Sequence, residues 1–545
     1  MYRPDRLPHA GAAPAASMRG ARRIVPIDRG PVYAGRMRID RRAFMRTIAA
    51  TAAWLTTGAA RAEDTTWQSE IHQQTRNTRW GPAGRTWWPT RRRTERVKDY
   101  PGRPRVALPA PRAPETRSLA SVVAGWDAAG RGLADDPLTL PELSRLLYFA
   151  NGITRTPLLR AAPSAGALYA GEIYVITDRV SGLEPGLYYY RPPEQELVRL
   201  SAGRHVDAVR AALEQPAEIG NAPVVVLLTN VFARYGWRYA NRGYRYALID
   251  TGHIGENLRV ASRSAGLAER SPLRFADDPL NDLLGVDGRQ EAVCALHAAG
   301  RPGAVNTSDE KRSLHESRQA PAGWGTTERY HARTRLVAAD GVPQPAPTQA
   351  GPPPGEPGPE RPATSVEDCI LNRRSASRFD DRPMDRATLD WMLDTAAGET
   401  ALSRGGWLRE APVELLLAVH RVRGLAAGLY RYDPAAGMPV PLREGDLRKA
   451  LVRTCLGQEK AGQCGVACFM VADLRRAQTL AGERSYRDLL VESGAIGQRI
   501  YLAAEAAGLC ARNLAAFRDD ELCELLGLDG RERVVLHLTL AGHGT

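Results

Sequence analysis

The feature that most constrains this 545-residue chain is an internal repeat. Three segments of its first half return, in the same order, in its second half. Self-similarity of this kind indicates a duplicated folding unit. We therefore predict two copies of one fold. The paired segments are PGLYYYR at 185–191 with AGLYRYD at 427–433, DTGHIGEN at 250–257 with ESGAIGQR at 492–499, and LLGVDG at 283–288 with LLGLDG at 525–530.

The first copy mixes helical and strand patterns. Thr139–Ala150 has the apolar spacing of a helix behind the start signal TLPE, and Tyr246–Gly266 is a second helical stretch. Glu172–Thr177 and Val224–Thr229 are predicted strands, the second of them buried. The chain is therefore expected to belong to the α+β class.

Composition divides the chain into five segments. Proline-rich runs such as 351–359 cannot bury apolar surface and favour extended chain, which predicts a linker between the two copies. The predicted segments are an N-terminal extension with an export signal at 1–62, an irregular Arg- and Pro-rich lead-in at 63–117, a first domain at 118–303, the linker at 304–364 and a second domain at 365–545.

The N-terminal segment has the order of regions found in a signal peptide. Arg41 and Arg42 begin it, a moderately apolar stretch follows at 47–60, and Ala60 and Ala62 suit a cleavage site. The apolar stretch is shorter than the about 20 residues of a membrane span. We expect a twin-arginine signal that directs the chain to the translocase and out of the cytoplasm, for example to the periplasm, and both Met1 and Met37 are candidates for the true start. The alternative is an amphipathic helix that begins with Arg-Arg.

The formal net charge of +13 does not indicate nucleic-acid binding. Only four of the 74 basic residues are lysines, and the arginines are scattered instead of lying along one element. The seven cysteines have no spacing of a disulfide framework. Cys464 and Cys468 lack a second ligand pair, so we predict no metal site, and the apolar run 466–471 predicts that Cys468 is a buried hydrophobic residue.

The second copy opens with adjacent basic and hydroxyl side chains, Arg373, Arg374 and Ser375. Guanidinium groups donate in a fork that matches phosphate oxygens, so this triplet suits a phosphate or a ribityl phosphate. Taken alone, the same triplet also fits a solvated basic turn between helices.

With these motifs the sequence resembles the nitroreductase family, most closely its SagB-type branch of azoline dehydrogenases, over roughly residues 97–303 and 365–545. The resemblance implies two nitroreductase-like α/β sandwich domains that form a pseudo-dimer within one monomeric chain. It also implies FMN bound between them, by an RRSxR motif from one side and a PSAG-type loop from the other. The motifs in the first copy are DYP at 99–101, PSAGALY at 163–169, GLYYY at 186–190, WRY at 237–239, RGYRY at 242–246, Gly252-His253 and GRP at 300–302.

Each copy lacks one of the two FMN motifs. The first has Gly125–Ala128, including an aspartate that would repel a phosphate, where RRS belongs, and keeps only Arg131. The second has Leu402–Trp407 where PSAGAL belongs. We therefore expect one FMN per chain, in a composite site. Its predicted residues are Arg373, Arg374, Ser375 and Arg378 from the second copy, with Arg378 one position late because Ser377 stands in the motif's place, and Pro163, Ser164, Ala165 and Gly166 from the first.

Further contacts follow from the resemblance. Gln458 is expected at the polar edge of the flavin, and Ala515 and Ala516 occupy the place where family members present a backbone N–H to flavin N5. Arg238 and Tyr239 stand where azoline dehydrogenases have a Lys-Tyr pair that is implicated in proton movement. Arginine cannot act as a base, so Tyr239 works with an electrostatic partner, or the substrate is not an azoline, or Tyr239 is a packed aromatic. His253 is assigned to packing.

The expected activity is hydride transfer through FMN to or from a small-molecule or peptide substrate. Two alternatives stand beside it. One is NAD(P)H-dependent reduction of nitro or quinone compounds, which export disfavours because reduced nicotinamides are not available outside the cytoplasm. The other is a catalytically degenerate protein that binds a flavin or a partner.

Overall fold

In the computed structural model, all of the described residues lie within Thr65–Thr545. The export signal expected in 1–62, the Gly125–Ala128 segment with Arg131, the Leu402–Trp407 segment and the proline run at 351–359 lie outside the described residues. The described residues are 67–78, 81–82, 95–111, 117–124, 132–155, 158–304, 311–317, 326–338, 362–397, 408 and 411–545.

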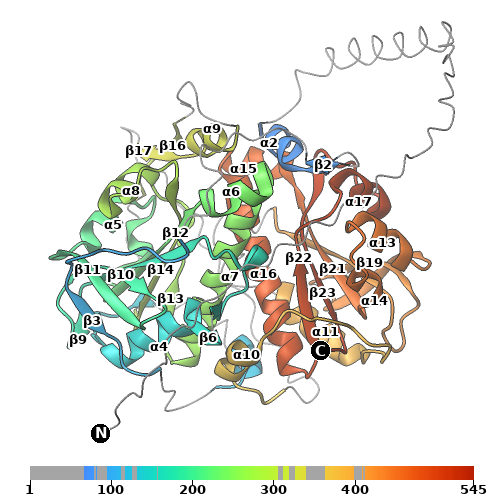
Figure 1. Ribbon diagram of the computed structural model, residues 1–545, viewed down its shortest axis with the longest axis horizontal. Helices are drawn as coiled ribbons and strands as arrows, with labels where there is room; N and C mark the ends of the chain where they lie inside the picture. The colour runs from blue at the N-terminus through green and yellow to red at the C-terminus, as the bar shows by residue number, and fades with distance from the viewer. Residues whose placement is uncertain are drawn as a thin grey trace, which may run out of the picture. The chain divides into compact units, whose positions relative to one another are not determined.

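The first copy of the repeat folds around an antiparallel sheet of seven described strands. Their order is β13-β14-β12-β8-β10-β11-β3, and the edge strand β3 comes from the lead-in before the first copy (Figure 1). The strands are β3 (Arg105–Ala107), β8 (Gly171–Thr177), β10 (Gly186–Arg191), β11 (Glu196–Ala202), β12 (Val224–Val231), β13 (Ala268–Arg270) and β14 (Glu291–Gly300).

The second copy repeats this sheet without the added edge strand. Its six described strands have the order β20-β19-β18-β21-β23-β22, which is the order of their counterparts in the first sheet. Even the bulges recur, because the register shifts between Leu228 and Thr229 in one copy and between Met470 and Val471 in the other. The predicted duplication is confirmed. The strands are β18 (Glu414–Val419), β19 (Gly428–Asp433), β20 (Met438–Glu444), β21 (Val466–Asp473), β22 (Cys510–Leu514) and β23 (Arg533–Gly542).

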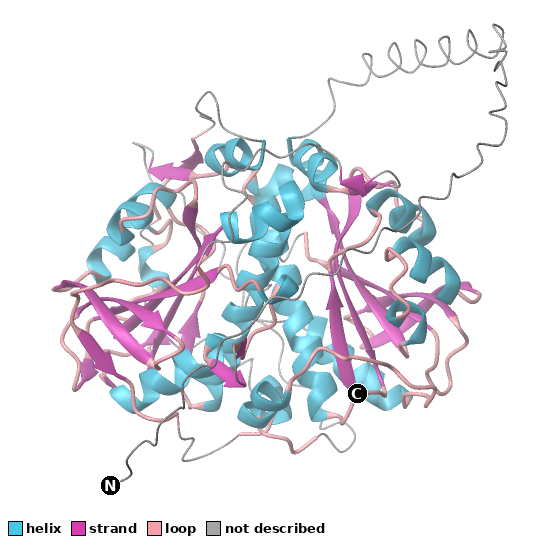
Figure 2. Ribbon diagram, viewed as in Figure 1, coloured by secondary structure: helices cyan, strands magenta, loops and turns pink. Residues whose placement is uncertain are grey.

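Two 22-residue helices, α7 (Gly243–Ser264) and α16 (Ser485–Ala506), lie between the two sheets (Figures 1 and 2). They cross at Gly252 and Gly494, where the backbones are in direct contact. A Cβ atom built on Gly252 would lie 2.7 Å from the backbone N of Ala495, and one on Gly494 would lie 2.8 Å from the carbonyl carbon of Ile249. Both glycines belong to the repeated segment, so the repeat places one glycine of each copy at the crossing.

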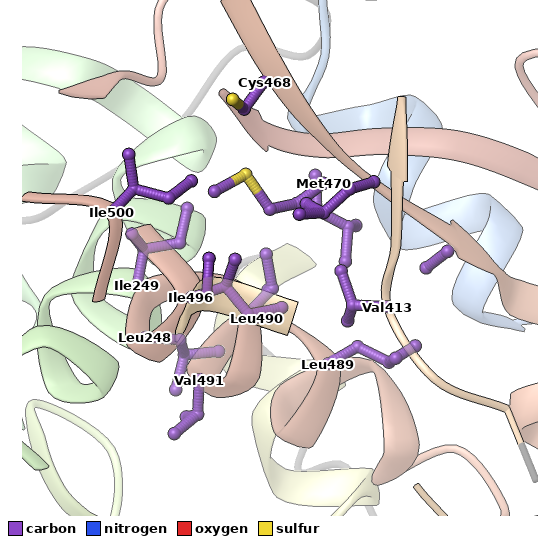
Figure 3. Close-up of a cluster of buried hydrophobic side chains, with 14 of the residues drawn as sticks. Leu248, Ile249, Val413, Cys468, Met470, Leu489, Leu490, Val491, Ile496 and Ile500 are labelled. Carbon is purple, nitrogen blue, oxygen red and sulfur yellow. The ribbon is translucent and has the colours of Figure 1, made fainter. Parts of the chain in front are cut away.

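The two copies share one apolar core. Leu248 and Ile249 of α7 pack with Leu489 and Ile496 of α16 and with Met470 of the second sheet (Figure 3). Burial of such side chains contributes roughly 1.5–3 kcal/mol each. Because this core belongs to both copies, the first copy cannot separate from the second without exposing it.

The predicted local elements of the first copy are also present. Helix α4 (Leu140–Asn151) begins with a capping box in which Thr139 and Glu142 bond each other's backbone N–H. The predicted strands correspond to β8 and β12, which are buried, and the second predicted helix corresponds to α7. Cys468 is fully buried in β21, as expected from its apolar run.

The segment predicted as a linker contains regular structure where it is described. Strands β16 (Leu314–Glu316) and β17 (Leu336–Ala338) pair, and helix α9 (Thr326–Arg333) lies between them in the sequence. Tyr330 and Leu336 are fully buried, because this part of the segment carries apolar residues that the proline-rich part lacks.

The remaining elements are shorter and surround the two sheets. The helices are α2 (Trp67–Thr75), α3 (Leu119–Ala124), α5 (Val206–Ala212), α6 (Ala233–Tyr239), α8 (Asp277–Leu284), α10 (Val366–Asn372), α11 (Arg386–Ala397), α13 (Arg448–Thr454), α14 (Lys460–Gln463), α15 (Leu474–Ala481) and α17 (Asp519–Leu526). The short strands are β1 (Asn77–Thr78), β2 (Gly81–Pro82), β4 (Gly132–Leu133), β5 (Leu138–Thr139), β6 (Ile153–Arg155), β7 (Leu159–Arg160), β9 (Val180–Ser181) and β15 (Pro302–Gly303).

Candidate functional site

The loop 163–169, which carries the PSAGALY motif, has a strained backbone. Gly166, Ala167 and Tyr169 all have positive φ angles, between 50° and 60°. Non-glycine residues rarely adopt this conformation unless their surroundings hold them in it. Pro163, Ser164 and Ala165 are half-buried and Gly166 is exposed, so the loop presents its backbone at the surface of the first copy.

Polar contacts to α6 and α7 hold this loop in place. The hydroxyl of Ser164 lies 2.7 Å from that of Tyr235 and accepts the N–H of Tyr169 at 2.8 Å. Asp250 of α7 accepts the N–H of Ala165 at 3.3 Å and also accepts the Tyr235 hydroxyl. Burial, and then Asp250, raise the pKa of Tyr235 well above its usual value, so this phenol stays protonated and donates.

Arg238 and Tyr239, at the end of α6, lie directly against the loop. A Cβ atom on Gly166 would collide with the Tyr239 hydroxyl and would lie 3.5 Å from Arg238 Nη1, so glycine is required for space as well as for its φ angle. The Arg238 guanidinium lies 5.4 Å from the centre of the Tyr239 ring. Burial raises the pKa of Tyr239, with Arg238 opposing, so the phenol keeps its proton at neutral pH.

Backbone strain is concentrated around the predicted site. Among the described residues, five non-glycine residues have positive φ angles. Ala167 and Tyr169 belong to the loop 163–169, Ala240 directly follows Tyr239, and Leu456 lies two residues before Gln458. Strained residues of this kind collect at functional sites, where surrounding contacts over-determine the backbone. This observation points to the same residues as the motifs do. The fifth is Gln195, on the hairpin of β10 and β11.

The second copy contributes the residues that follow α10. Ser375 pairs with Ala511 of β22, and its hydroxyl lies 2.7 Å from that of Tyr501 on α16. Arg373 donates from Nε to the carbonyl of Ala161 at 3.1 Å, two residues before Pro163. The two FMN motifs predicted from different copies are therefore neighbours. Arg378 is exposed and makes only backbone contacts, to Thr545.

Four arginines here form no ion pair among the described residues, although the Glu505 carboxylate is near enough to Arg373 and Arg374 to act on them electrostatically: Arg373, Arg374, Arg378 and, on β22, Arg512. Arg374 donates to the carbonyls of Leu371 and Arg373, and its buried Nε makes no hydrogen bond there. Arg512 donates to the carbonyl of Ala376, and its buried Nε is likewise without an acceptor. Guanidinium groups that form no ion pair and keep free donors suit a phosphate, so these residues fit the phosphate end of FMN.

The peptide group between Ala515 and Ala516 is fixed from the first copy. The carbonyl of Ala515 accepts Nε and Nη2 of Arg242, at 2.9 and 2.8 Å, and the Tyr246 hydroxyl at 3.1 Å. In a trans peptide the N–H points opposite to the C=O, so the N–H of Ala516 points away from Arg242. Neither it nor the N–H of Ala515 has an acceptor among the described residues. Gln458 donates to the carbonyl of Ala516 at 3.1 Å.

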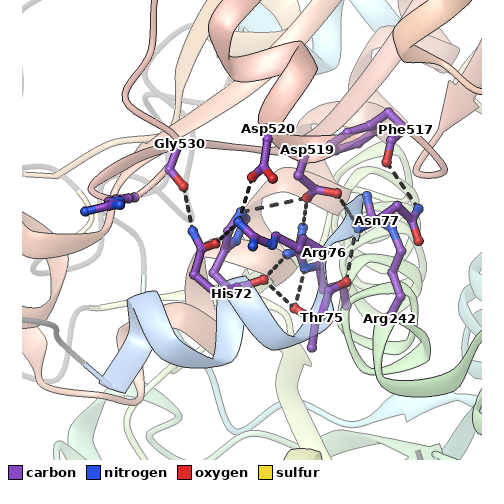
Figure 4. A network of polar contacts seen from close by, with 12 residues as sticks. His72, Thr75, Arg76, Asn77, Arg242, Phe517, Asp519, Asp520 and Gly530 are labelled. Atoms are coloured by element: carbon purple, nitrogen blue, oxygen red, sulfur yellow. Dashed lines mark hydrogen bonds and ion pairs between the residues drawn. The ribbon is translucent and has the colours of Figure 1, made fainter. Parts of the chain in front are cut away.

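The same arginine belongs to a buried ion-pair group that we call the Arg242 clamp: Arg242, Arg245 and Asp519. Each guanidinium lies 2.6 Å from one carboxylate oxygen of Asp519. The N-terminal helix α2 completes it, because carbonyls of His72 and Thr75 accept from Arg245 and Arg242, and the N–H of Asn77 donates to Asp519 at 2.9 Å (Figure 4). The clamp connects the start of α7 of the first copy to Asp519, the first residue of α17 of the second.

The repeat contains a second buried ion-pair group, a second clamp, at the equivalent positions. Arg484 and Arg487 of the second copy pair with Asp277 of the first at 2.5 and 2.9 Å, and Arg484 donates to the carbonyl of Leu273 at 3.1 Å. Burial alone would raise the pKa of Asp277, but the two arginines outweigh it and hold that pKa below its usual value. Each copy thus places two arginines on an aspartate of the other.

Sequence reasoning missed these clamps although a signal was present. RGYRY at 242–246 returns as RSYRD at 484–488, and FADD at 275–278 returns as FRDD at 517–520. These two further repeats contain both clamps. Tyr501, Arg512 and Asn513 were also missed, because none of them belongs to a recognised motif.

A family comparison identifies the fold that carries this site. The model of the nitroreductase family matches residues 129–301 and again 370–543, once in each copy of the repeat. The chain belongs to the nitroreductase family. Both matched segments end in the long strands β14 and β23, so the family unit is the repeated unit described above.

Individual relatives agree with this assignment. The chain is 34% identical over 154 residues to the "Putative nitroreductase" of Methanocaldococcus jannaschii, which covers 28% of this chain and 78% of that protein. It is 25% identical over 146 residues to the "Microcin B17-processing protein" of Escherichia coli, covering 26% of this chain and about half, 54%, of that protein. The solved structure of a "putative nitroreductase" from Anabaena variabilis has a TM-score of 0.70 at 25% identity, covering 88% of this chain and all of that one.

Within the described part of the chain, no group of His, Cys, Asp and Glu side chains is arranged to hold a metal ion. The described helices also include none with the length and apolarity needed to cross a membrane. All seven cysteines are unpaired thiols, and six of them are buried.

Proposed function

We propose that this chain is an exported, FMN-dependent oxidoreductase with a single flavin site between its two copies. The observation that carries the proposal is the proximity of the loop 163–169, the arginines beside Ser375 that form no ion pair, and the free N–H groups of Ala515 and Ala516. Members of the nitroreductase family generally bind FMN, which accepts and releases hydride when bound. Because the sequence resembles azoline dehydrogenases, the proposed substrate is either a peptide or a small molecule.

The residues present define which part of FMN each would hold. Arg374, Arg512 and Ser375 would bind the phosphate, because their donors lack carboxylate partners. The N–H of Ala515 or Ala516 would donate to the ring, held in orientation by Arg242 and Tyr246. Arg373 would position the loop 163–169 through the carbonyl of Ala161.

The repeat supplies a physical reason for one site instead of two. Glu269 occupies in the first copy the place of Ala511, the residue that pairs with Ser375. Its carboxylate is buried; burial would raise its pKa, but His297 at 3.1 Å and Ser271 outweigh this and lower the pKa to about 2. A negative charge there offsets the positive charge of Arg259, Arg263 and Arg270 around it, which makes the first copy less suited to a phosphate. The absence of RRS from the first copy and the charge of Glu269 therefore both disfavour a second FMN site.

The stoichiometry of bound FMN tests the proposal. We expect the purified chain, reconstituted with FMN, to release close to one FMN per chain on denaturation, measured by flavin absorbance against protein concentration. Two per chain would contradict the single site, and a chain that cannot be reconstituted would overturn the function.

Arg374→Ala should weaken FMN binding about 10- to 100-fold, because a hydrogen-bonded charge is lost. Arg382→Ala, which removes an exposed arginine paired with Asp380, should leave FMN binding unchanged.

Tyr239 is proposed as the proton donor beside the flavin. Its hydroxyl lies against Gly166 of the loop 163–169. Its raised pKa keeps the phenol of Tyr239 protonated at neutral pH. With dithionite-reduced holoenzyme and p-benzoquinone as the acceptor, we expect Tyr239→Phe to lower the reoxidation rate constant about 100-fold, a typical loss for a general acid. Bound FMN should be retained. Tyr432→Phe, which removes a buried hydroxyl that has no hydrogen-bond partner, is the control. Equal rates for Tyr239→Phe and wild type would assign Tyr239 to packing.

Export rests on the signal-like segment and agrees with the state of the cysteines. The twin-arginine route carries folded proteins, and in a folded chain six of the seven thiols are buried from oxidation. In a bacterium that has a twin-arginine translocase, the wild-type chain should reach the periplasmic fraction. The double variant Arg41→Lys and Arg42→Lys should stay in the cytoplasm, as an immunoblot of the fractions would measure. Unchanged export of that variant would exclude the twin-arginine route.

A further inference from the structure

A series of polar contacts runs from the loop 163–169 of the first copy to Ser375 of the second, and its central residue is His253. On the first side, Asp250 is 4% exposed and accepts the N–H of Ala165. His253, one helical turn after Asp250, is 2% exposed, and its Nδ1 lies 3.7 Å from Asp250 Oδ1, which is an electrostatic approach and not a hydrogen bond, since Nδ1 has no hydrogen-bond partner among the described residues. These residues connect the loop to the face of α7 that looks toward the second copy.

On the second side, His253 contacts β22. Its Nε2 lies 2.6 Å from Nδ2 of Asn513, whose Oδ1 accepts the hydroxyl of Thr539 at 2.5 Å. Because Oδ1 is already an acceptor, Nδ2 is the donor that faces His253, so Nε2 accepts and the ring proton lies on Nδ1, toward Asp250. This tautomer is assigned from the hydrogen-bond network.

From Asn513 the contacts reach the phosphate end of the proposed site. The N–H of Asn513 donates to the Tyr501 hydroxyl at 2.9 Å, and that hydroxyl lies 2.7 Å from Oγ of Ser375. Asn513 also lies two residues before Ala515. Hydrogen bonds therefore connect His253 to Ser375 through Asn513 and Tyr501, while Asp250 brings the loop 163–169 within 3.7 Å of His253 and the sequence places Ala515 two residues after Asn513.

The repeat shows that this connection exists on one side only. In the aligned segments DTGHIGEN and ESGAIGQR, the counterpart of His253 is Ala495, which has no polar side chain. The counterpart of Asn513 is Ser271, which bonds His297 at 2.7 Å instead of a residue of the other copy. Packing between α7 and α16 alone does not account for a histidine that contacts Asn513 only on the side that carries both FMN motifs.

We infer that His253 is a positioning residue that sets the spacing between the two copies' contributions to the flavin site. The inference rests on the proposed function, because it concerns the same site. His253 does not touch the flavin; it acts through Asp250 and Asn513. Its removal would leave the buried amide of Asn513 without its hydrogen-bond partner and would take the imidazole away from the carboxylate of Asp250, so both parts of the site would shift.

The repeat supplies the variants that test this inference. His253→Ala and Asn513→Ser each install the residue of the other copy. We expect each to raise the Kd for FMN about tenfold, measured by fluorescence titration of the apoprotein, and to change the flavin's visible spectrum. Because both residues belong to one series of contacts, the double variant should raise the Kd by much less than the product of the two single effects.

The matched control is His297→Ala. His297 is a buried histidine of similar exposure, 5%, whose hydrogen bonds stay within the first copy. It should lower the Tm of the apoprotein without changing the Kd for FMN. If His253→Ala lowers the Tm in the same way but has the same Kd for FMN and the same flavin spectrum as the wild type, His253 is structural and the inference is wrong. The inference is also wrong if the double variant raises the Kd by the full product of the two single effects.

Two further outcomes are distinct from these. If His253→Ala does not fold, His253→Gln, which keeps a side-chain amide in that space, and Asn513→Ser decide the question by the same titration. If the wild-type chain does not bind FMN, the proposed function fails as a whole. By contrast, wild-type binding with an unaffected His253 variant leaves the proposed function intact and removes only the role of His253.

Discussion

Gly494→Ala is expected to destabilise the whole unit severely, although it adds a single methyl group. The new Cβ would collide with the carbonyl oxygen of Ile249 and lie 3.0 Å from its Cα, and all of these are backbone atoms that no rotamer change can move. α7 and α16 would have to separate along the core that both copies share. Overpacking usually costs about 1–3 kcal/mol, and a collision between two helix backbones should exceed about 4 kcal/mol. Urea denaturation followed by circular dichroism measures the loss.

The chain offers two comparisons for this prediction. Gly252→Ala should be as damaging, since its Cβ would meet backbone atoms of Val491 and Ala495 across the same crossing. Gly465→Ala should be tolerated, because its Cβ would meet Ala541 and Gly542 at ordinary distances of 3.4–3.5 Å. A Gly494→Ala chain as stable as Gly465→Ala would mean that the helices do not approach as closely as described.

Much of the fold follows from the sequence because the repeat is visible in it. The matched segments predicted two copies of one fold, and the copies have the same strand order and the same bulges. Local patterns located α4, β8 and β12 because capping residues and apolar runs act over short distances. The two FMN motifs, which are far apart in the sequence, were placed together only by the resemblance; in the structure Arg373 donates to Ala161, two residues before Pro163.

The contacts between the copies could not be predicted in the same way. Both FADD and FRDD are visible in the sequence, but nothing in the sequence says whether Arg242 pairs with Asp277 of its own copy or Asp519 of the other. The crossing of α7 and α16 decides this, because it places each arginine pair beside the aspartate of the other copy. His253 was assigned to packing for the same reason, since its partner Asn513 belongs to the other copy.

Asp519→Asn is expected to cause the second large effect, on stability and on FMN binding together. Arg242 and Arg245 are 3% and 1% exposed, and the substitution leaves both guanidinium groups without their counter-charge. Removing one partner of a buried ion pair costs about 3–5 kcal/mol. Arg242 would also lose the anchor that holds it against the carbonyl of Ala515, so the peptide that presents its N–H groups to the flavin would no longer be fixed.

The symmetry of the two clamps separates these two effects. Asp277→Asn removes a charge from Arg484 and Arg487, which are equally buried, but Asp488 still lies 3.8 Å from Arg484 Nε, so the Tm should fall by less than for Asp519→Asn. However, Arg484 bonds the carbonyl of Leu273, on the side where Glu269 disfavours a phosphate, so FMN binding there is not expected. We therefore expect Asp519→Asn to raise the Kd for FMN about tenfold or more, and Asp277→Asn to leave it unchanged. Equal effects of the two variants on the Kd would mean that the clamps act on FMN only through overall stability, and that the two sides of the chain are not functionally different.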